Sequence, residues 1–249
     1  MKLVVLAAGY ATRLYPLTLD RPKALLPVGA KPMLEHVLDA LAPVEAIDSV
    51  YVVTNAKFAG QFRDWAGGYG GRQVTVVDDG TTSDETRLGA IGDLDLVIRS
   101  QHVDDDVIAV AGDNLFSETL EGFGRFARER GAPVLGVYDV GDLEEMRKYS
   151  AISTDEDGCI TAFEEKPEHA RSTLCGIALY YYPRAALPLI RRYVEEGNNR
   201  DQPGRLIEWL YTRTPVYAWP VPGVWYDIGA EDTLREADRV FSQAASAQS

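Results

Sequence analysis

The sequence predicts an α/β fold, with a Rossmann-like, mostly parallel sheet flanked by helices and followed by a β-rich second half. Two observations carry this prediction. Strand-like and helix-like segments alternate through the first half of the chain, and after about residue 130 the spacing changes to strands joined by short connections. Strand-helix-strand units cross over with one hand, so this alternation builds a parallel sheet whose strands end at one edge.

In the first half, four short apolar runs are predicted to be strands buried on both faces: 3–7, 50–54, 74–77 and 107–111. Three intervening segments have the apolar spacing of helices: 33–42, 57–66 and 87–99. Ligands of such sheets lie at the carboxyl ends of the strands. The residues that follow each strand are therefore the candidates for ligand binding.

The second half is predicted to contain strands at 133–140, 149–154, 159–164 and 174–182. Asp157-Gly158 suits a tight turn inside this region. Helical patterns return at 184–196, 203–212 and 230–245. We see no repeat and no linker that would divide the chain, so we expect a single domain over 1–249, made of the halves 1–130 and 131–249.

Composition and charge exclude several classes of partner. With 249 residues, 46% of them hydrophobic, the chain is long enough for a large core. Its net charge of −13 repels nucleic-acid backbones and anionic membranes, so we expect neither as a partner. Residues 1–31 are a local exception with a net charge of +4, where Asp20 is outnumbered by Lys2, Arg13, Arg21, Lys23 and Lys31.

The two cysteines, Cys159 and Cys175, both fall in strand-like stretches and do not suggest a disulfide framework. We predict that both thiols are buried and inert. The sequence shows neither a signal-peptide pattern nor an apolar run of membrane-spanning length, so a cytoplasmic location is expected.

The turn after the first strand is the first candidate site. Ala7, Ala8 and Gly9 carry little side chain, so their backbone N–H groups can approach a base or a phosphate, and Arg13 can meet phosphate oxygens with its fork of donors. The turn matches neither the Walker pattern nor a complete G-x-G-x-x-G fingerprint. Taken alone, it fits an ordinary strand-to-loop turn equally well.

Two further segments strengthen this interpretation. Lys23 lies between Pro22 and Pro27, which restrict the backbone and partly pre-organise the lysine. Asp113 follows Gly112 at the end of a predicted strand, and Asp227 ends a short aromatic strand just before a helix. Either aspartate alone is compatible with turn or capping chemistry, whereas two carboxylates together suit Mg²⁺.

The run "LAAGYATRLYPLT…RPKALLPVGAKPML" resembles the signature of the sugar-1-phosphate nucleotidylyltransferases, and the similarity extends over most of the chain. The resemblance implies that the loop covers the base and phosphates of a nucleotide, through Leu6, Ala7, Ala8, Gly9, Tyr10, Ala11 and Thr12. It places Arg13 at the β and γ phosphates and Lys23 at the α phosphate. It also implies that Asp113, after Gly112, and Asp227 of "WYDIG" hold the catalytic Mg²⁺.

The same resemblance assigns the acceptor side of the site. In "FEEKPEH", Lys166 would bind the phosphate of the sugar and Glu165 its hydroxyl groups, while Gly176 would lie on the strand that closes the sugar pocket. The half 1–130 is then the nucleotide-binding half and 131–249 the acceptor-binding half.

The sequence departs from the family where the base is chosen. The family carries a glutamine before a Gly-Leu/Thr-Ala step, whereas this chain has "DDGTTSDETRLGAIG" over 78–92, where Thr81, Thr82, Ser83 and Arg87 are the candidate base readers. Ala11 replaces the second glycine of the loop signature. For Asp201 and Arg205, exposed loop charge is favoured over acceptor contact, and the three histidines, which are scattered, are assigned no chemistry.

The sequence thus predicts a Mg²⁺-dependent enzyme that joins a nucleoside triphosphate to a sugar-1-phosphate and releases pyrophosphate. A cytidylyltransferase for a non-sugar phosphate or a phosphonate is the alternative within this class. An inactive regulatory protein of the same fold, or an NAD-dependent oxidoreductase, fits less well, because Lys23, Asp113, Lys166 and Asp227 are all present and the dinucleotide fingerprint is incomplete. The nucleobase, the sugar and the formation of a homodimer are left open.

Overall fold

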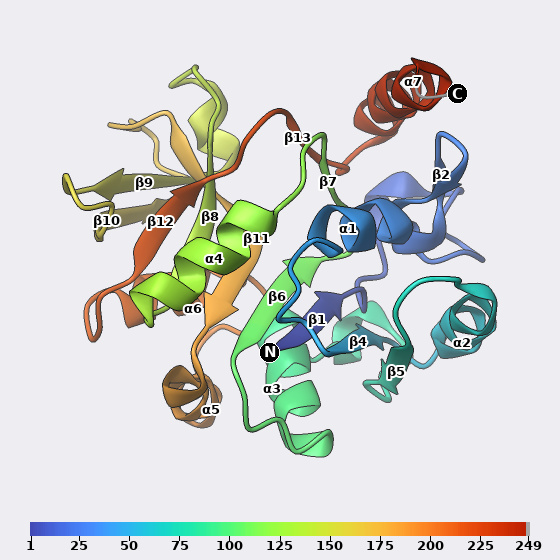
Figure 1. Cartoon of the computed structure of the whole chain (residues 1–249), viewed down its shortest axis with the longest axis horizontal. Coiled ribbons are helices and arrows are strands. Elements are labelled where there is room, and N and C mark those ends of the chain that lie inside the picture. The colour runs from blue at the N-terminus through green and yellow to red at the C-terminus, as the bar shows by residue number, and fades with distance from the viewer. Residues whose placement is uncertain (248–249) are drawn as a thin grey trace.

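The carboxyl ends of four parallel strands lie side by side at one edge of the main sheet. The computed structural model describes residues 1–247, with side chains through residue 243. In it β1 lies between β4 and β6, and β5 extends this parallel arrangement beyond β4 (Figure 1). The strands are β1 (Lys2–Leu6), β4 (Ser49–Thr54), β5 (Val74–Asp78) and β6 (Val107–Ala111). All four predicted strands of the first half are therefore confirmed within two residues at each end.

Helices cover both faces of this sheet, as the apolar strands require. Along β1, Leu3 and Val5 pack into the cluster beneath one set of helices, and Val4 packs into the cluster on the opposite face. The first set is α1 (Met33–Leu41), α2 (Ala59–Gly68) and α4 (Glu121–Arg130). The second is α3 (Ala90–Ser100), α5 (Leu187–Glu195) and α6 (Gly204–Leu210).

The second half joins the sheet through one antiparallel contact, between β11 and β6. Beyond this contact β11 also pairs with β8 and β9, and β12 runs parallel to β8. β9 and β10 form a hairpin across the turn expected at Asp157-Gly158. Gly158 of the hairpin has a φ of 80°, a conformation that suits glycine. These strands are β8 (Val134–Asp139), β9 (Ser150–Thr154), β10 (Ile160–Glu165), β11 (Leu174–Tyr182) and β12 (Tyr217–Pro220).

Two small two-stranded sheets position loops above the carboxyl edge. β7 (Asn114–Phe116) pairs with β13 (Trp225–Asp227), and β2 (Pro27–Val28) pairs with β3 (Lys31–Pro32). The last helix, α7 (Glu231–Ala247), packs against β2, where Asp238 accepts a hydrogen bond from the Gly29 backbone N–H at 2.7 Å (Figure 1). Short 3-10 turns complete the chain: η1 (Thr12–Leu14), η2 (Lys23–Leu25), η3 (Asp84–Thr86), η4 (Glu145–Lys148) and η5 (Arg184–Ala186).

Helix α4 is absent from the sequence-based prediction, for a physical reason. Gly122 and Gly124 lower its intrinsic helix propensity, so the local pattern is weak. In the fold, a Cβ at Gly124 would lie 2.5 Å from Val44 Cγ1, which shows that the helix packs too closely on its neighbour for a larger residue. Tertiary packing, with Phe123 fully buried, stabilises this helix.

The two cysteines differ in environment. Cys175 is fully buried, and burial raises the pKa of its thiol to about 12, as expected for an inert side chain. Cys159 is only half-buried, so the prediction of burial is wrong for that residue. Both are free thiols, and no helix in the described part of the chain is long and apolar enough to cross a membrane.

Candidate active site

A cavity of about 720 Å³ opens at the carboxyl edge of β1 and β6, between the two halves of the chain. Both halves contribute to its walls, as expected for a site that brings two reactants together. From the first half it is lined by Leu6, Ala8, Gly9, Tyr10, Ala11, Thr12, Arg13, Asp84, Arg87, Gly89, Ala90, Asp93, Ala111, Asp113 and Asn114. From the second half it is lined by Leu135, Lys148, Tyr149, Ser150, Phe163, Glu165, Gly176, Ile177, Ala178, Tyr180, Asp201, Gln202, Pro203, Gly204, Trp225 and Asp227.

The loop after β1 is held from below by the end of the neighbouring strand. Asn55 donates a hydrogen bond from its side-chain amide to the Ala8 carbonyl at 2.8 Å, and the Thr54 hydroxyl donates to the Ala7 carbonyl at 3.2 Å. Both Thr54 and Asn55 are fully buried. These buried polar contacts fix the loop, whose predicted members all line the cavity except Ala7.

Ala11 adopts a left-handed backbone conformation, with φ 49° and ψ 43°. Its carbonyl accepts a hydrogen bond from the buried Thr18 hydroxyl at 2.8 Å. A left-handed conformation is unfavourable for alanine because its Cβ crowds the following carbonyl. The chain therefore keeps at residue 11 the backbone shape that a glycine would adopt without strain.

The positively charged and acidic residues predicted for the phosphate region lie together. Asp113 follows β6, Asp227 ends β13, and the β7–β13 pairing brings residue 227 beside residue 114. The Lys23 ammonium forms an ion pair with the Asp113 carboxylate. Arg13 lies on the 3-10 turn η1 and approaches the Gly229 region that follows Asp227.

The pKa of Asp227 is affected by the neighbouring charges of Asp113, Lys23 and Arg13. Burial raises the pKa of Asp227, and the negative charge of Asp113 raises it further, whereas Lys23 and Arg13 oppose the shift. Two carboxylates that disfavour each other's charge make a suitable place for a divalent cation.

The donor set fits Mg²⁺. This ion prefers oxygen ligands and commonly takes one or two protein carboxylates, completing its shell with water and substrate phosphates. Within residues 1–247, as far as side chains are described, no group of three or more His, Cys, Asp or Glu side chains is placed to hold a metal alone. Asp113 and Asp227 are therefore suited to a cation that arrives with phosphate oxygens, rather than to a closed protein cage.

The second half of the chain contributes polar side chains to the cavity wall. Glu165 accepts a hydrogen bond from the Ser150 hydroxyl, and both line the cavity. Trp225 packs against the ring of Tyr149, and its indole N–H is buried without an acceptor among the described residues. This wall offers a donor and a carboxylate to a polar ligand.

The sequence also assigned Gly176 and Lys166 to this wall, and only the first of them lines the cavity. Gly176 lines the cavity, and a Cβ there would lie 3.0 Å from Leu135 Cδ2, so close packing is a second reason for the glycine. Lys166 is exposed and does not line the cavity, although its backbone N–H bonds the Tyr149 carbonyl at 3.0 Å. Lys148, which sequence reasoning missed because it belongs to no quoted motif, does line it.

Of the predicted base readers, Thr82 and Ser83 do not line the cavity, and the Ser83 hydroxyl caps η3 instead. Gly112, predicted to bind the nucleotide beside Asp113, does not line it either and is packed against Ala24 and Val5. Thr81 is buried, with its hydroxyl 3.3 Å from the Tyr10 hydroxyl.

Arg87 closes one side of the cavity. It binds both carboxylate oxygens of Asp201, with the Nη2 contact at 2.8 Å, and also forms an ion pair with Asp84 at 2.7 Å. Asp201 therefore has a partner at the cavity wall, whereas Arg205 is paired with Glu208 and does not line the cavity.

An acidic pair, the buried Asp93 and the half-buried Asp79, lies at this end of the cavity. Asp93, in the first turn of α3, is 5% exposed, and burial, followed by the charge of Asp79, raises its pKa to about 8. Burial also raises the pKa of Asp79, although the Thr81 backbone N–H donates to its Oδ1 at 2.7 Å. Two acidic groups in contact hold one proton between them near neutral pH.

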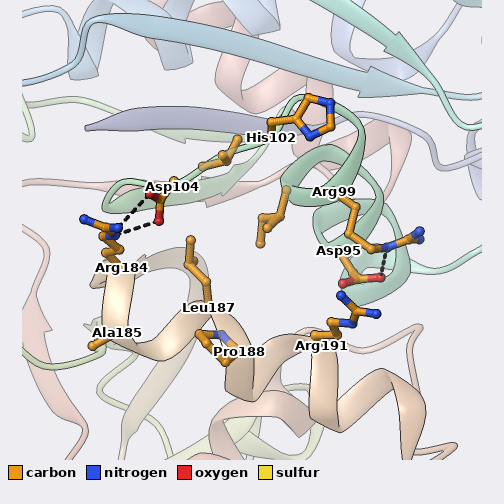
Figure 2. Close-up of a pocket in the computed structure, with 11 residues that line it drawn as sticks. Asp95, Arg99, His102, Asp104, Arg184, Ala185, Leu187, Pro188 and Arg191 are labelled. Carbon is orange, nitrogen blue, oxygen red and sulfur yellow. Dashed lines mark hydrogen bonds and ion pairs between the residues drawn. The ribbon is translucent and has the colours of Figure 1, made fainter.

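A second cavity of about 810 Å³ lies at the opposite edge of the sheet, between α3 and the start of α5 (Figure 2). Its charged walls are already paired: Arg99 contacts Asp95 at 2.8 Å, and Arg184 contacts Asp104 at 2.6 Å. No residue that the sequence placed in the active site lines this cavity.

Comparison with known proteins agrees with the geometry. Residues 2–243 match the family model described as nucleotidyl transferase. A UTP–glucose-1-phosphate uridylyltransferase from Haloferax volcanii is 31% identical over 240 residues, which cover 96% of each chain. A UTP–glucose-1-phosphate uridylyltransferase from Synechocystis is 30% identical over 240 residues, covering 92% of this chain and 60% of that protein.

Solved structures show the same fold. A UDP-glucose pyrophosphorylase complexed with UDP-glucose superposes with a TM-score of 0.82, at 20% identity, covering 98% of both chains. The chain spans 54–60% of the length of three curated relatives that it matches, and almost all of the Haloferax protein. The α/β fold predicted from the sequence is confirmed by these superpositions.

We expect Ala11→Gly to stabilise the chain. Glycine adopts the left-handed conformation of residue 11 without the Cβ clash, so the free energy of unfolding should rise by about 0.5–1 kcal/mol and Tm by about 1–3 °C. Calorimetry measures both. Ala8→Gly is the control in the same loop: Ala8 is not among the residues with positive φ, so glycine there should lower Tm. Equal effects of the two changes would contradict the argument.

The Asp79–Asp93 pair should make stability fall with rising pH. Asp93 has a raised pKa, so between about pH 4 and pH 8 the folded chain holds a proton that the unfolded chain releases, and the free energy of unfolding decreases by at most about 1.4 kcal/mol per pH unit. Asp93→Asn, which donates to Asp79 without a titrating proton, should reduce this decline. Urea unfolding at pH 5 and pH 8 measures it, and identical slopes in the two proteins would refute it.

Proposed function

The chain belongs to the nucleotidyl transferase family, and we propose that it transfers the nucleotidyl group of a nucleoside triphosphate to a sugar-1-phosphate, with Mg²⁺, to give a nucleotide-sugar and pyrophosphate. Two relatives of about 30% identity carry names for this reaction type. The observation that carries the proposal is the meeting of Arg13, Asp113 and Asp227 in a cavity lined by both halves of the chain. Lys23 does not line the cavity itself but pairs with Asp113 at its wall.

The positive charges are distributed as the reaction needs them. Lys23 is already held at Asp113, so its ammonium stands where the charge of the α phosphate has to be neutralised. Arg13 supplies planar N–H donors beside Asp227, suited to the leaving pyrophosphate. Asp113 and Asp227 would hold Mg²⁺, which when bound neutralises phosphate charge and orients the phosphates.

The transfer needs no general base. An oxygen of the acceptor phosphate, largely ionised near neutral pH, attacks the α phosphorus in line. The bond from that phosphorus to the bridging oxygen breaks, and pyrophosphate leaves with the bridging oxygen and its electron pair. Consistent with this chemistry, none of the described residues that line the cavity is a histidine or a cysteine. In this mechanism the chain accelerates the reaction by positioning the reactants and neutralising their charge.

The acceptor lies, in this proposal, against the second half of the chain. Glu165 and the unpartnered indole N–H of Trp225 face polar groups of the sugar, and Gly176 leaves room beside them. Lys148 at the cavity wall and Lys166 next to Glu165 are the cations proposed for its phosphate. The nucleoside would then bind at the other end of the cavity, which is lined by Tyr10, Arg87, Gly89 and Asp93.

A matrix of substrates tests the proposal. Pyrophosphate release is measured for five nucleoside triphosphates against a set of sugar-1-phosphates and against phosphocholine, with Mg²⁺ and with chelator. We expect turnover with at least one sugar-1-phosphate that chelator abolishes. Turnover with phosphocholine alone would favour the non-sugar acceptor, and folded protein without turnover on any pair would overturn the proposal.

Asp113→Asn should abolish most of the activity. The change removes one of the two cation-holding carboxylates and the partner of Lys23, so kcat should fall by about 10²–10³, the effect of losing one charge-stabilising group. Asp39→Asn is a matched control, because Asp39 also pairs with a lysine, Lys31, but on the exposed surface. Near-normal pyrophosphate release by Asp113→Asn would contradict the assignment.

Lys148→Ala should weaken acceptor binding. Losing one charge-assisted contact to the acceptor phosphate should raise the KM for the sugar-1-phosphate about tenfold, with a smaller effect on the KM for the nucleotide. Arg147→Ala controls for the loss of a neighbouring charge. Arg147 pairs with Glu144 at 3.1 Å as Lys148 pairs with Glu145 at 2.6 Å, but only Lys148 lines the cavity. An unchanged acceptor KM in Lys148→Ala would remove Lys148 from the site.

A further inference from the structure

One wall of the cavity carries a buried carboxyl group that no N–H or O–H donor of the chain satisfies. Asp93 lines the cavity and is 5% exposed, yet its Oδ1 has no hydrogen-bond donor among the described residues. The same holds for Oδ2 of its neighbour Asp79. Buried acceptors without donors are unusual in folded proteins, and each requires a physical reason.

The two unpartnered oxygens satisfy each other through one proton. Asp79 is fixed as the acceptor, because the Thr81 backbone N–H donates to its Oδ1 at 2.7 Å. Burial raises the pKa of Asp93 to about 8, and its hydrogen bond to Asp79 contributes to the shift. The shared proton lies between Oδ1 of Asp93 and Oδ2 of Asp79, the two buried oxygens without a donor. The remaining oxygen of Asp93 is then available as an acceptor to a ligand in the cavity that Asp93 lines.

The other polar side chains at this end are already engaged. The Tyr10 hydroxyl lies 3.3 Å from the Thr81 hydroxyl, and the guanidinium of Arg87 is bound to Asp201 and Asp84. Among the side chains of this wall, the one left to meet a ligand is thus Asp93, as a hydrogen-bond acceptor. The glutamine expected from the family resemblance would instead offer both a donor and an acceptor.

We propose that Asp93, held by Asp79, accepts a hydrogen bond from the exocyclic amino group of the nucleobase, so that the chain selects a cytosine, adenine or guanine nucleotide over a uracil or thymine nucleotide. This inference rests on the proposed function for the location of the nucleoside. Uracil and thymine place a carbonyl oxygen where cytosine has its amino group, so two acceptors would face each other at the wall. A buried pair of acceptors without a donor is strongly disfavoured.

Equilibrium binding of matched nucleotides tests the inference without an acceptor substrate. The full chain is titrated by calorimetry, in the presence of Mg²⁺, with CTP, UTP, GTP, ATP and ITP, since ITP has the purine frame of the other two without their amino groups. The matched pairs are CTP with UTP, GTP with ITP and ATP with ITP. We expect the tightest ligand to carry an amino group and to bind at least tenfold more tightly than the nucleotide matched with it. UTP as the tightest ligand, or equal affinities within each matched pair, would overturn the inference.

Three variants assign the preference to Asp93. Asp93→Leu removes the acceptor, so the tenfold ratio between the affinities of the two matched nucleotides should fall below about threefold. Asp93→Asn keeps a carbonyl toward the cavity while its amide donates to Asp79, so it should retain the ratio. Asp95→Leu is the matched control, because Asp95 is equally buried in α3 but pairs with Arg99 at the cavity of Figure 2, and it should also retain the ratio.

The outcomes separate this inference from the proposed function. A tenfold ratio that persists in Asp93→Leu would refute the role of Asp93, and the wild-type comparison remains decisive if that variant does not fold. Pyrophosphate release is measured in parallel on the wild-type chain. An amino preference without turnover on any sugar-1-phosphate would refute the proposed function and leave the base inference standing, whereas turnover with a preference for UTP would do the opposite.

Discussion

The mutual repulsion of two carboxylates, offset by two cations, is the constraint around which this chain is organised. Asp113 and Asp227 are 114 positions apart and meet because β7 pairs with β13. The charge of Asp113 raises the free energy of ionised Asp227, and the charges of Lys23 and Arg13 reduce this penalty. Every loop that supplies these groups has to be anchored elsewhere in the structure for the arrangement to persist.

The anchors are ordinary secondary-structure contacts. The parallel strands β1 and β6 deliver the Arg13 loop and Asp113 to one edge, buried Thr54 and Asn55 hold the loop from below, and α7 packs against β2 on the far side of Asp227. The antiparallel β11–β6 pairing then places the second half of the chain across the same edge. A cavity between the halves follows from this pairing, because the two groups of loops project from one side of a continuous sheet.

Locally unfavourable features, a strained backbone conformation and buried acidic oxygens, occur at the site, whereas the structure around it is regular. Ala11 is left-handed, and Asp79 and Asp93 are acids whose facing oxygens are buried without a donor, while the strands beneath pack apolar side chains on both faces. Such exceptions concentrate at functional sites because the surrounding structure over-determines the conformation. This acidic pair differs from Asp113 and Asp227: Lys23 and Arg13 balance Asp113 and Asp227, whereas Asp79 and Asp93 balance each other by sharing a proton.

The sequence by itself determined the order of strands and helices in the parallel half and the turn near Gly158. It also determined that a carboxylate and a cation follow the strands. These features depend on local periodicity and turn chemistry. It missed α4, whose glycines are explained only by close packing on Val44, and the short strands β7 and β12, which exist through their partners. Only the tertiary structure decided which side chains face the cavity. It placed Lys148 and Asp93 at the wall and Thr82, Ser83 and Lys166 away from it, because the direction of a loop side chain is set by contacts with residues distant in sequence.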